Sequence, residues 1–121
     1  MEQDYSKMQG SLVAIATETF RVSKVLEKVL TKIDAEDQQK YASQFAWFFK
    51  KVTKELELNG IRLVNLEGKE YQPGDAIVPL NIADFSPNET LYIQQMIEPI
   101  IMNDGTILKT GTALLERRTG Q

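Results

Sequence analysis

The chain has 121 residues, of which 42% are hydrophobic and 26% are charged, with a net charge of −3 and a pI near 5.0. This length fits one domain or two very small ones. A mildly acidic chain is a poor general binder of nucleic acids or anionic membranes, which usually require a basic excess. We therefore expect neither nucleic acid nor membrane as a partner.

The sequence contains no cysteine and no histidine. These residues supply the usual zinc ligands, the thiolate nucleophile and the commonest general base, so their absence disfavours the matching enzyme chemistries. It also shows no Gly-rich phosphate loop, nucleophile elbow or EF-hand spacing. We expect no catalytic residue, no metal and no cofactor, and a protein that is not an enzyme. A carboxylate cluster of Glu67, Glu70 and Asp75 is the weaker, enzymatic alternative.

The first ten residues, MEQDYSKMQG, are polar and acidic, unlike the basic and then apolar start of a signal peptide. No apolar run approaches the roughly 20 residues that span a bilayer. We therefore expect a cytoplasmic location.

Apolar residues in the first third of the chain recur in alternating steps of three and four. This spacing predicts a helix of about 28 residues, about 42 Å long, with a coiled-coil seam. The rest of the chain is too small to cover such a seam, which favours oligomerisation; the alternative is a helix that packs only on its own domain. The seam consists of Tyr5, Met8, Leu12, Ile15, Thr19, Val22, Leu26, Val29 and Ile33.

A second helix is expected from Ala35 to Leu58, with Asp34 as its N-cap and Asn59-Gly60 as its stop. Because the connector is short, the two helices should form an antiparallel hairpin, and two hairpins would make a four-helix bundle. Trp47 falls outside the apolar face of this second helix. The residues expected at the dimer interface are Leu12, Ile15, Val22, Leu26, Val29, Ile33, Phe45 and Phe48.

After Gly60 the pattern changes to short apolar runs separated by turn residues. Asn103-Asp104-Gly105 is a good hairpin signal, and the tail from Arg117 is expected to be loose. The predicted fold is α+β, with a helical dimerisation hairpin at residues 1–59 and a compact all-β domain at 60–121. Strands are predicted at 61–66, 76–78, 91–97, 100–102, 107–109 and 112–115.

Between Val22 and Glu116 the sequence resembles the GrpE family of nucleotide exchange factors. The resemblance rests on the order of elements and on three stretches. In "LELNGIRLVNLEGKEYQP" a helix end is followed by Gly60, an apolar pair and an aromatic residue before Pro73. "AIVPL" is similar to the strand that follows, and "LYIQQMIEPIIMNDGTILKTGTALLE" to the closing strands, with Lys109 as their basic residue.

The resemblance implies a homodimeric co-chaperone that binds the nucleotide-binding domain of a DnaK-type chaperone and promotes ADP release. It implies partner contacts at two places in the β domain, a turn and a strand hairpin. The sequence departs from the family pattern at Asp75, Pro99-Ile100, Thr106 and Thr110-Gly111, which favours a dimeric, non-enzymatic adaptor or scaffold as the alternative. The expected partner-binding residues are Gln72, Pro73, Asp75, Asn103, Asp104 and Lys109.

Overall fold

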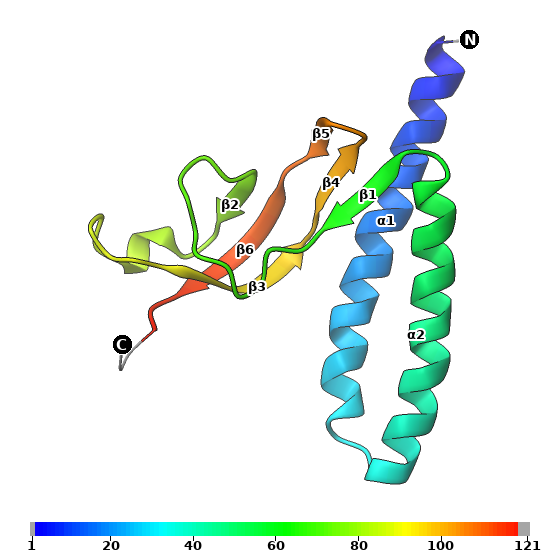
Figure 1. The fold of residues 1–121 in the computed structure, drawn as a ribbon, viewed down its shortest axis with the longest axis horizontal. Coiled ribbons are helices and arrows are strands. Elements are labelled where there is room, and N and C mark those ends of the chain that lie inside the picture. Colours follow the sequence, from blue (N-terminus) through cyan, green and yellow to red (C-terminus); the bar gives the residue numbers. More distant parts are fainter. Residues whose placement is uncertain (1, 119–121) are drawn as a thin grey trace. The chain divides into compact units, whose positions relative to one another are not determined.

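The computed structural model of this chain describes residues 2–118, and the chain divides into two compact units, Met1–Arg62 and Leu63–Gln121. Two long helices are followed by a small region of short strands (Figure 1). This arrangement confirms the predicted α+β class in its coarse form.

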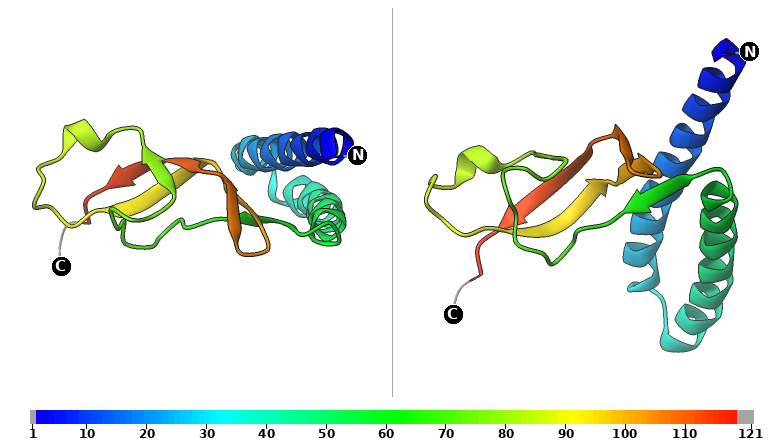
Figure 2. Two further views of the ribbon diagram at one scale, coloured as in Figure 1. Left: turned by 90° about the horizontal axis from the view of Figure 1, so that it is seen from above. Right: turned by 45° about the horizontal axis from the view of Figure 1, so that its top comes forward.

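The first unit consists of α1 (Glu2–Leu30) and α2 (Ala35–Glu57). The two helices lie side by side and a short turn joins them, as Figure 1 and the right view of Figure 2 show. We call them the helical pair. With a rise of 1.5 Å per residue, the 29 residues of α1 are about 44 Å long.

The ends of α2 follow the capping chemistry that the sequence predicts. Asp34 has an extended backbone, and its Oδ1 accepts a hydrogen bond of 3.1 Å from the backbone N–H of Asp37. Gly60 has a φ of 76°, the left-handed conformation that favours glycine after a helix. The predicted seam runs past the end of α1, however, because α1 ends at Leu30 and Ile33 lies in the turn that Asp34 requires.

The strands that follow the helices form two three-stranded sheets, one in the order β1-β4-β5 and one in the order β2-β6-β3, and all but the first two residues of β1 belong to the second unit. In the second sheet β6 lies between a parallel neighbour, β2, and an antiparallel neighbour, β3 (Figure 1). The strands are β1 (Ile61–Val64), β2 (Ile77–Pro79), β3 (Tyr92–Glu98), β4 (Ile100–Asn103), β5 (Thr106–Lys109) and β6 (Gly111–Glu116).

The core of this unit follows the alternation of β6, where Ala113 and Leu115 are buried and their neighbours are half-buried. Ile93 and Met96 of β3 are both buried although they are three positions apart, a spacing that puts side chains on opposite faces of a regular strand. A shift of register between Ile93 and Gln95 inserts one extra residue, so both side chains reach the same face.

Each predicted strand is present, with ends that differ by one or two residues. The first strand ends at Val64 rather than residue 66, because the Asn65 side chain accepts a hydrogen bond from the Glu67 N–H and starts a turn. A short 3-10 helix at Ile82–Asp84 was not predicted. It lies in the connection between β2 and β3.

The close approach of β6 to the β3–β4 corner gives a test of this packing. A Cβ on Gly111 would lie 2.8 Å from the Glu98 carbonyl oxygen and 3.1 Å from the Ile100 nitrogen. Gly111→Ala should therefore lower the free energy of unfolding by about 1–3 kcal/mol, measured by urea denaturation. Gly105→Ala is the matched control, since nothing lies within 4 Å of its Cβ. Equal losses in the two variants would contradict the assigned register.

Candidate functional site

The predicted apolar seam splits into two sets of side chains with different exposure. An inner set is half-buried and consists of Leu12, Thr19, Leu26 and Ile33; Tyr5, at the same position of the repeat, is 63% exposed. An outer set is 46–67% exposed and consists of Met8, Ile15, Val22 and Val29. Since both sets lie on one helical stripe, α1 keeps an open row of apolar side chains along most of its length.

A groove lies in the helical pair beside this row, with a volume of about 460 Å³. Tyr41 and Phe48 of α2 are about half exposed here, and the Phe48 and Phe45 ring centroids lie 6.1 Å apart. Gln44 is the one polar residue in its lining, which consists of Leu26, Val29, Leu30, Ile33, Tyr41, Gln44, Phe45 and Phe48. The groove therefore brings together five of the predicted dimerisation residues, Leu26, Val29, Ile33, Phe45 and Phe48.

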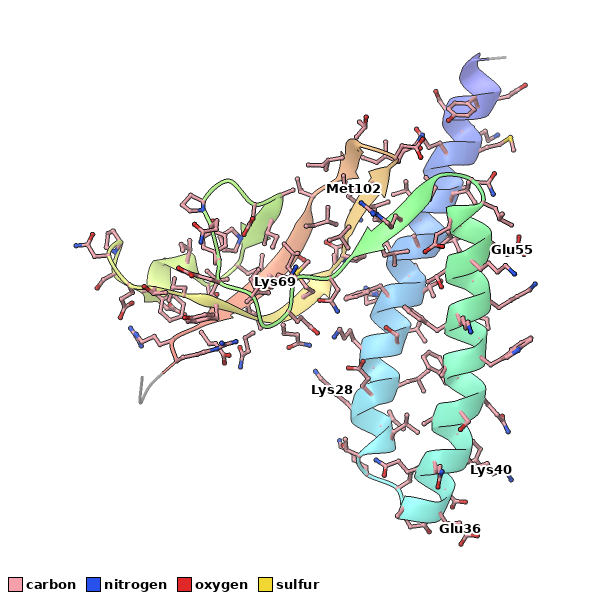
Figure 3. All side chains as sticks on the ribbon, viewed as in Figure 1. Lys28, Glu36, Lys40, Glu55, Lys69 and Met102 are labelled. Atoms are coloured by element: carbon pink, nitrogen blue, oxygen red, sulfur yellow. The ribbon has the colours of Figure 1, made fainter. Side chains whose placement is uncertain are left out.

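The outward faces of the helices carry charged side chains, with a few exposed apolar residues such as Val25 and Trp47 among them. Lys40 and Glu55 point away from α1 on the outer side of α2, and Lys28 projects from α1 away from α2 (Figure 3). Lys51 and Glu55 form an ion pair of 3.5 Å on α2. Trp47, which the sequence places outside the apolar face, is 69% exposed. The apolar opening of the helical pair is thus bordered by charged surface.

Three predicted partner-binding residues, Gln72, Pro73 and Asp75, lie together in one turn. The Asp75 Oδ2 accepts a hydrogen bond of 2.9 Å from the Gln72 N–H, and the Gln72 carbonyl oxygen accepts one from the Asp75 N–H. The Asp75 carboxylate thus holds its own turn together. Gln72 and Pro73 remain exposed.

The other three predicted residues lie on the β4–β5 hairpin. Asn103 and Asp104 form its tip, where Asp104 has a φ of 53°, while the Lys109 Nζ lies 3.2 Å from Glu98 Oε2. The 72–75 turn lies near the Lys109 end, because the Gly111 N–H donates to the carbonyl oxygen next to Asp75, that of Ala76. Asn103 at the tip pairs with Thr106, which is three residues from Lys109, about 10 Å along an extended strand. The six residues therefore form two groups.

The three carboxylates of the enzymatic alternative do not converge. Glu67 Oε2 accepts a hydrogen bond of 2.8 Å from the Met96 N–H, and Asp75 is used in its turn. Glu70 lines a separate cleft. Within residues 2–118, no group of three or more acidic side chains is placed to hold a metal ion, and no helix is sufficiently long and apolar to cross a membrane.

Two arginines that were expected in a loose tail are fastened to the second unit. Arg118 donates a hydrogen bond of 2.8 Å to the Gly68 carbonyl oxygen, and its guanidinium lies 3.9 Å from the centroid of the Tyr92 ring. The expectation of a loose tail at these two residues is therefore wrong. The sequence contains the arginine, the ring and the carbonyl group of this contact. It does not show that they meet, because only the fold brings Arg118 to Gly68, 50 residues away.

Arg117 is held in the same manner. Its Nε lies 2.6 Å from Glu89 Oε1, and its guanidinium lies 5.0 Å from the centroid of the Phe85 ring. Glu89 Oε2 also accepts a hydrogen bond of 2.9 Å from the Ser86 N–H. The hydrogen bond from Arg117, followed by that from Ser86, lowers the pKa of the Glu89 carboxyl, and the same contact raises the pKa of Arg117.

This contact predicts the direction of a titration. Because the pKa of Glu89 is lowered on folding, the contact stabilises the fold above the ordinary carboxyl pKa of about 4.3 and is lost as the pH falls through the lowered value. Carbon-detected NMR should give Glu89 a lower pKa in the native chain than in Arg117→Gln. Lys51→Gln, in the other unit, should leave it unchanged. Equal Glu89 pKa values with and without Arg117 would refute the contact.

No family model, no curated protein and no solved structure matches this chain. The surfaces described above are therefore the basis for its function.

Proposed function

We propose that this protein is a homodimeric, GrpE-like co-chaperone. The helical pair is a dimerising hairpin, and two copies form a four-helix bundle. The β unit binds the nucleotide-binding domain of a DnaK-type chaperone and promotes ADP release. The open apolar row on α1, together with the groove in the helical pair, is the observation that carries this proposal.

The size of the open surface supports a second copy as its occupant. The outer set runs from Met8 to Val29, about 32 Å along the helix, and two helices side by side are about 20 Å wide. A self-complementary contact over that area would bury roughly 600 Å² per copy, near the lower edge of stable interfaces. The 3.5-residue repeat is the pattern that a facing helix with the same repeat fits, knobs into holes.

Exchange activity requires no catalytic residue. A factor that binds the open, nucleotide-poor conformation of a chaperone better than the closed one accelerates release by that difference in affinity alone. The second unit offers exposed turn residues, Gln72 and Pro73, for such a contact. The element order of two helices, a glycine stop and a small β unit is also the order that the GrpE resemblance implies.

A non-exchanging adaptor with the same dimeric shape is the second candidate. Two of the predicted partner-binding residues already make contacts within this chain, which favours the adaptor. Asp75 closes its own turn, and Lys109 pairs with Glu98. Both side chains have structural partners that a chaperone contact would have to displace.

The dimer is tested by charge substitution in the outer set. Val22→Asp should convert the dimer to a monomer at micromolar concentration, because it places a charge in the apolar interface. Sedimentation velocity measures the mass, and circular dichroism checks the fold. Val22 is preferable to Leu26, since Leu26 belongs to the half-buried inner set and its change would also disturb the helical pair.

Val78→Asp is the matched control for this test. Val78 has the same exposure as Val22, 49%, but lies on an edge strand of the second unit. We expect this variant to remain a dimer. A folded Val22→Asp protein that sediments as a dimer would remove the proposed interface.

Exchange is tested by stopped-flow release of a fluorescent ADP from DnaK-type chaperones of the host. The co-chaperone predicts an acceleration that Gln72→Ala or Lys109→Gln weakens and Lys51→Gln leaves unchanged. No acceleration by the folded dimer with any of these chaperones would reject exchange activity and leave the adaptor.

A further inference from the structure

The side of α2 that faces away from α1 carries the one tryptophan of the chain, Trp47. A helix turns by about 100° per residue, so Leu56, nine residues further along, lies on the opposite side of α2 from Trp47. Leu56 is buried, whereas Trp47 is 69% exposed. Lys40, seven residues before Trp47, points away from α1 (Figure 3). The indole therefore lies on the outer side of the helical pair, and it is not part of the groove lining.

Lysines surround Trp47 on this side of the helix. At 100° per residue, four lysines lie within about 60° of it around the axis of α2. All of them are exposed, and residues 38–54 contain no Asp or Glu, although the whole chain has a net charge of −3. This part of α2 is therefore locally basic. We call it the lysine face; it consists of Lys40, Trp47, Lys50, Lys51 and Lys54.

The charges of the lysine face are used little within the chain. Lys51 pairs with Glu55, but both side chains of this ion pair are more than half exposed. The Lys40 Nζ lies over the Tyr41 ring, 5.9 Å from its centroid. The other two ammonium groups make no ion pair with any residue that the structure describes. The face is thus able to bind negative charge from outside the chain.

The side chains of the lysine face offer hydrogen-bond donors without acceptors. An ammonium group has three N–H donors and no acceptor, and the indole has one N–H donor. The ring of Trp47 adds apolar surface, and tryptophan is enriched among the residues that contribute most to the affinity of protein interfaces. A complementary partner therefore carries anionic acceptors around an apolar side chain.

The shape of the lysine face favours a protein as this partner. The face is one side of a single helix and hence convex, whereas single-stranded nucleic acids bind in grooves with several aromatic residues. A helix that lies in a membrane surface buries a wide apolar face, but the apolar face of α2 packs within the helical pair, as the burial of Leu56 shows. A partner helix makes contact through residues three, four and seven positions apart, the spacings that separate Trp47 from the four lysines.

We propose that the lysine face binds an acidic helix of a partner protein. An aliphatic side chain of that helix packs on the ring of Trp47, and carboxylates three, four and seven residues from it pair with Lys40, Lys50 and Lys54. The contact extends from Lys40 to Lys54, about 21 Å along α2. An interface of this size is small and partly electrostatic, so the complex is transient and weakens as salt is added.

This inference goes beyond the proposed co-chaperone or adaptor function, which uses the groove of the helical pair and the turns of the β unit. It depends on neither dimerisation nor ADP release, since the lysine face contains no residue of the groove lining. Its test can therefore fail while those proposals stand, and the reverse also holds.

The test uses the fluorescence of Trp47, which reports on the lysine face because the chain has no second tryptophan. The full chain is titrated with an alanine-based helical peptide that has a leucine at its centre and glutamates three, four and seven residues to either side. Binding should shift the emission to shorter wavelength and reduce quenching by acrylamide, because the ring leaves water. The same peptide with glutamine in place of every glutamate should bind about tenfold more weakly, the combined effect of a few exposed ion pairs.

Variants of the protein locate the contact. Lys50→Gln and Lys54→Gln should each weaken the acidic peptide about twofold. Lys28→Gln changes an exposed lysine of α1 that projects away from α2 (Figure 3), and should bind as the native chain does. Trp47→Ala should weaken binding several-fold, measured by the fluorescence anisotropy of a labelled peptide.

Three results would overturn the proposal. They are equal binding of the glutamate and glutamine peptides, equal losses in Lys28→Gln and Lys54→Gln, and no change in Trp47 emission at millimolar peptide. A stronger response of Trp47 to oligothymidylate, or to phosphatidylserine vesicles, than to the acidic peptide would also overturn it, and would replace the protein partner by a nucleic acid or a membrane.

Discussion

The constraint that shapes the first unit is the width of the apolar stripe on α1. A seam with two alternating sets of side chains needs partners on both sides, and α2 is a single helix. Its contact leaves the inner set half-buried and the outer set about half exposed. Because monomeric proteins rarely expose large contiguous apolar surfaces, the open half of the stripe is a stronger indication of association than any single exposed residue. The short connector after Leu30 also matters, because it makes α2 pack against α1 of the same chain.

In the second unit, charged side chains position their neighbours more than they stabilise the fold. Glu89 and Arg117 form a close pair, but both are solvent-accessible, and exposed pairs contribute little to the free energy of folding. Their effect is to fix where Phe85 lies. Apolar packing around β6 carries the stability instead, through Ala113, Leu115 and the Met96 side chain that the bulge turns inward. The two roles are separable, so the surface of this unit can change without loss of the core.

The sequence predicted those features that depend on local chemistry. The Asp34 cap, the Gly60 stop and the Asn103-Asp104-Gly105 turn all follow from the preferences of neighbouring residues. The predicted end of a strand was less accurate where a side chain accepts a backbone hydrogen bond and starts a turn, as Asn65 does. The parallel pairing of β2 with β6 joins residues more than thirty positions apart, and no local pattern encodes it.

The candidate sites show the same division. The groove in the helical pair contains five of the eight residues that the heptad spacing proposed, because a helical repeat specifies which side chains share a face. The cleft lined by Tyr71, Phe85 and Glu89 was missed, since its walls come from two loops that are separate in the sequence and Arg117, which pairs with Glu89, comes from after the last strand.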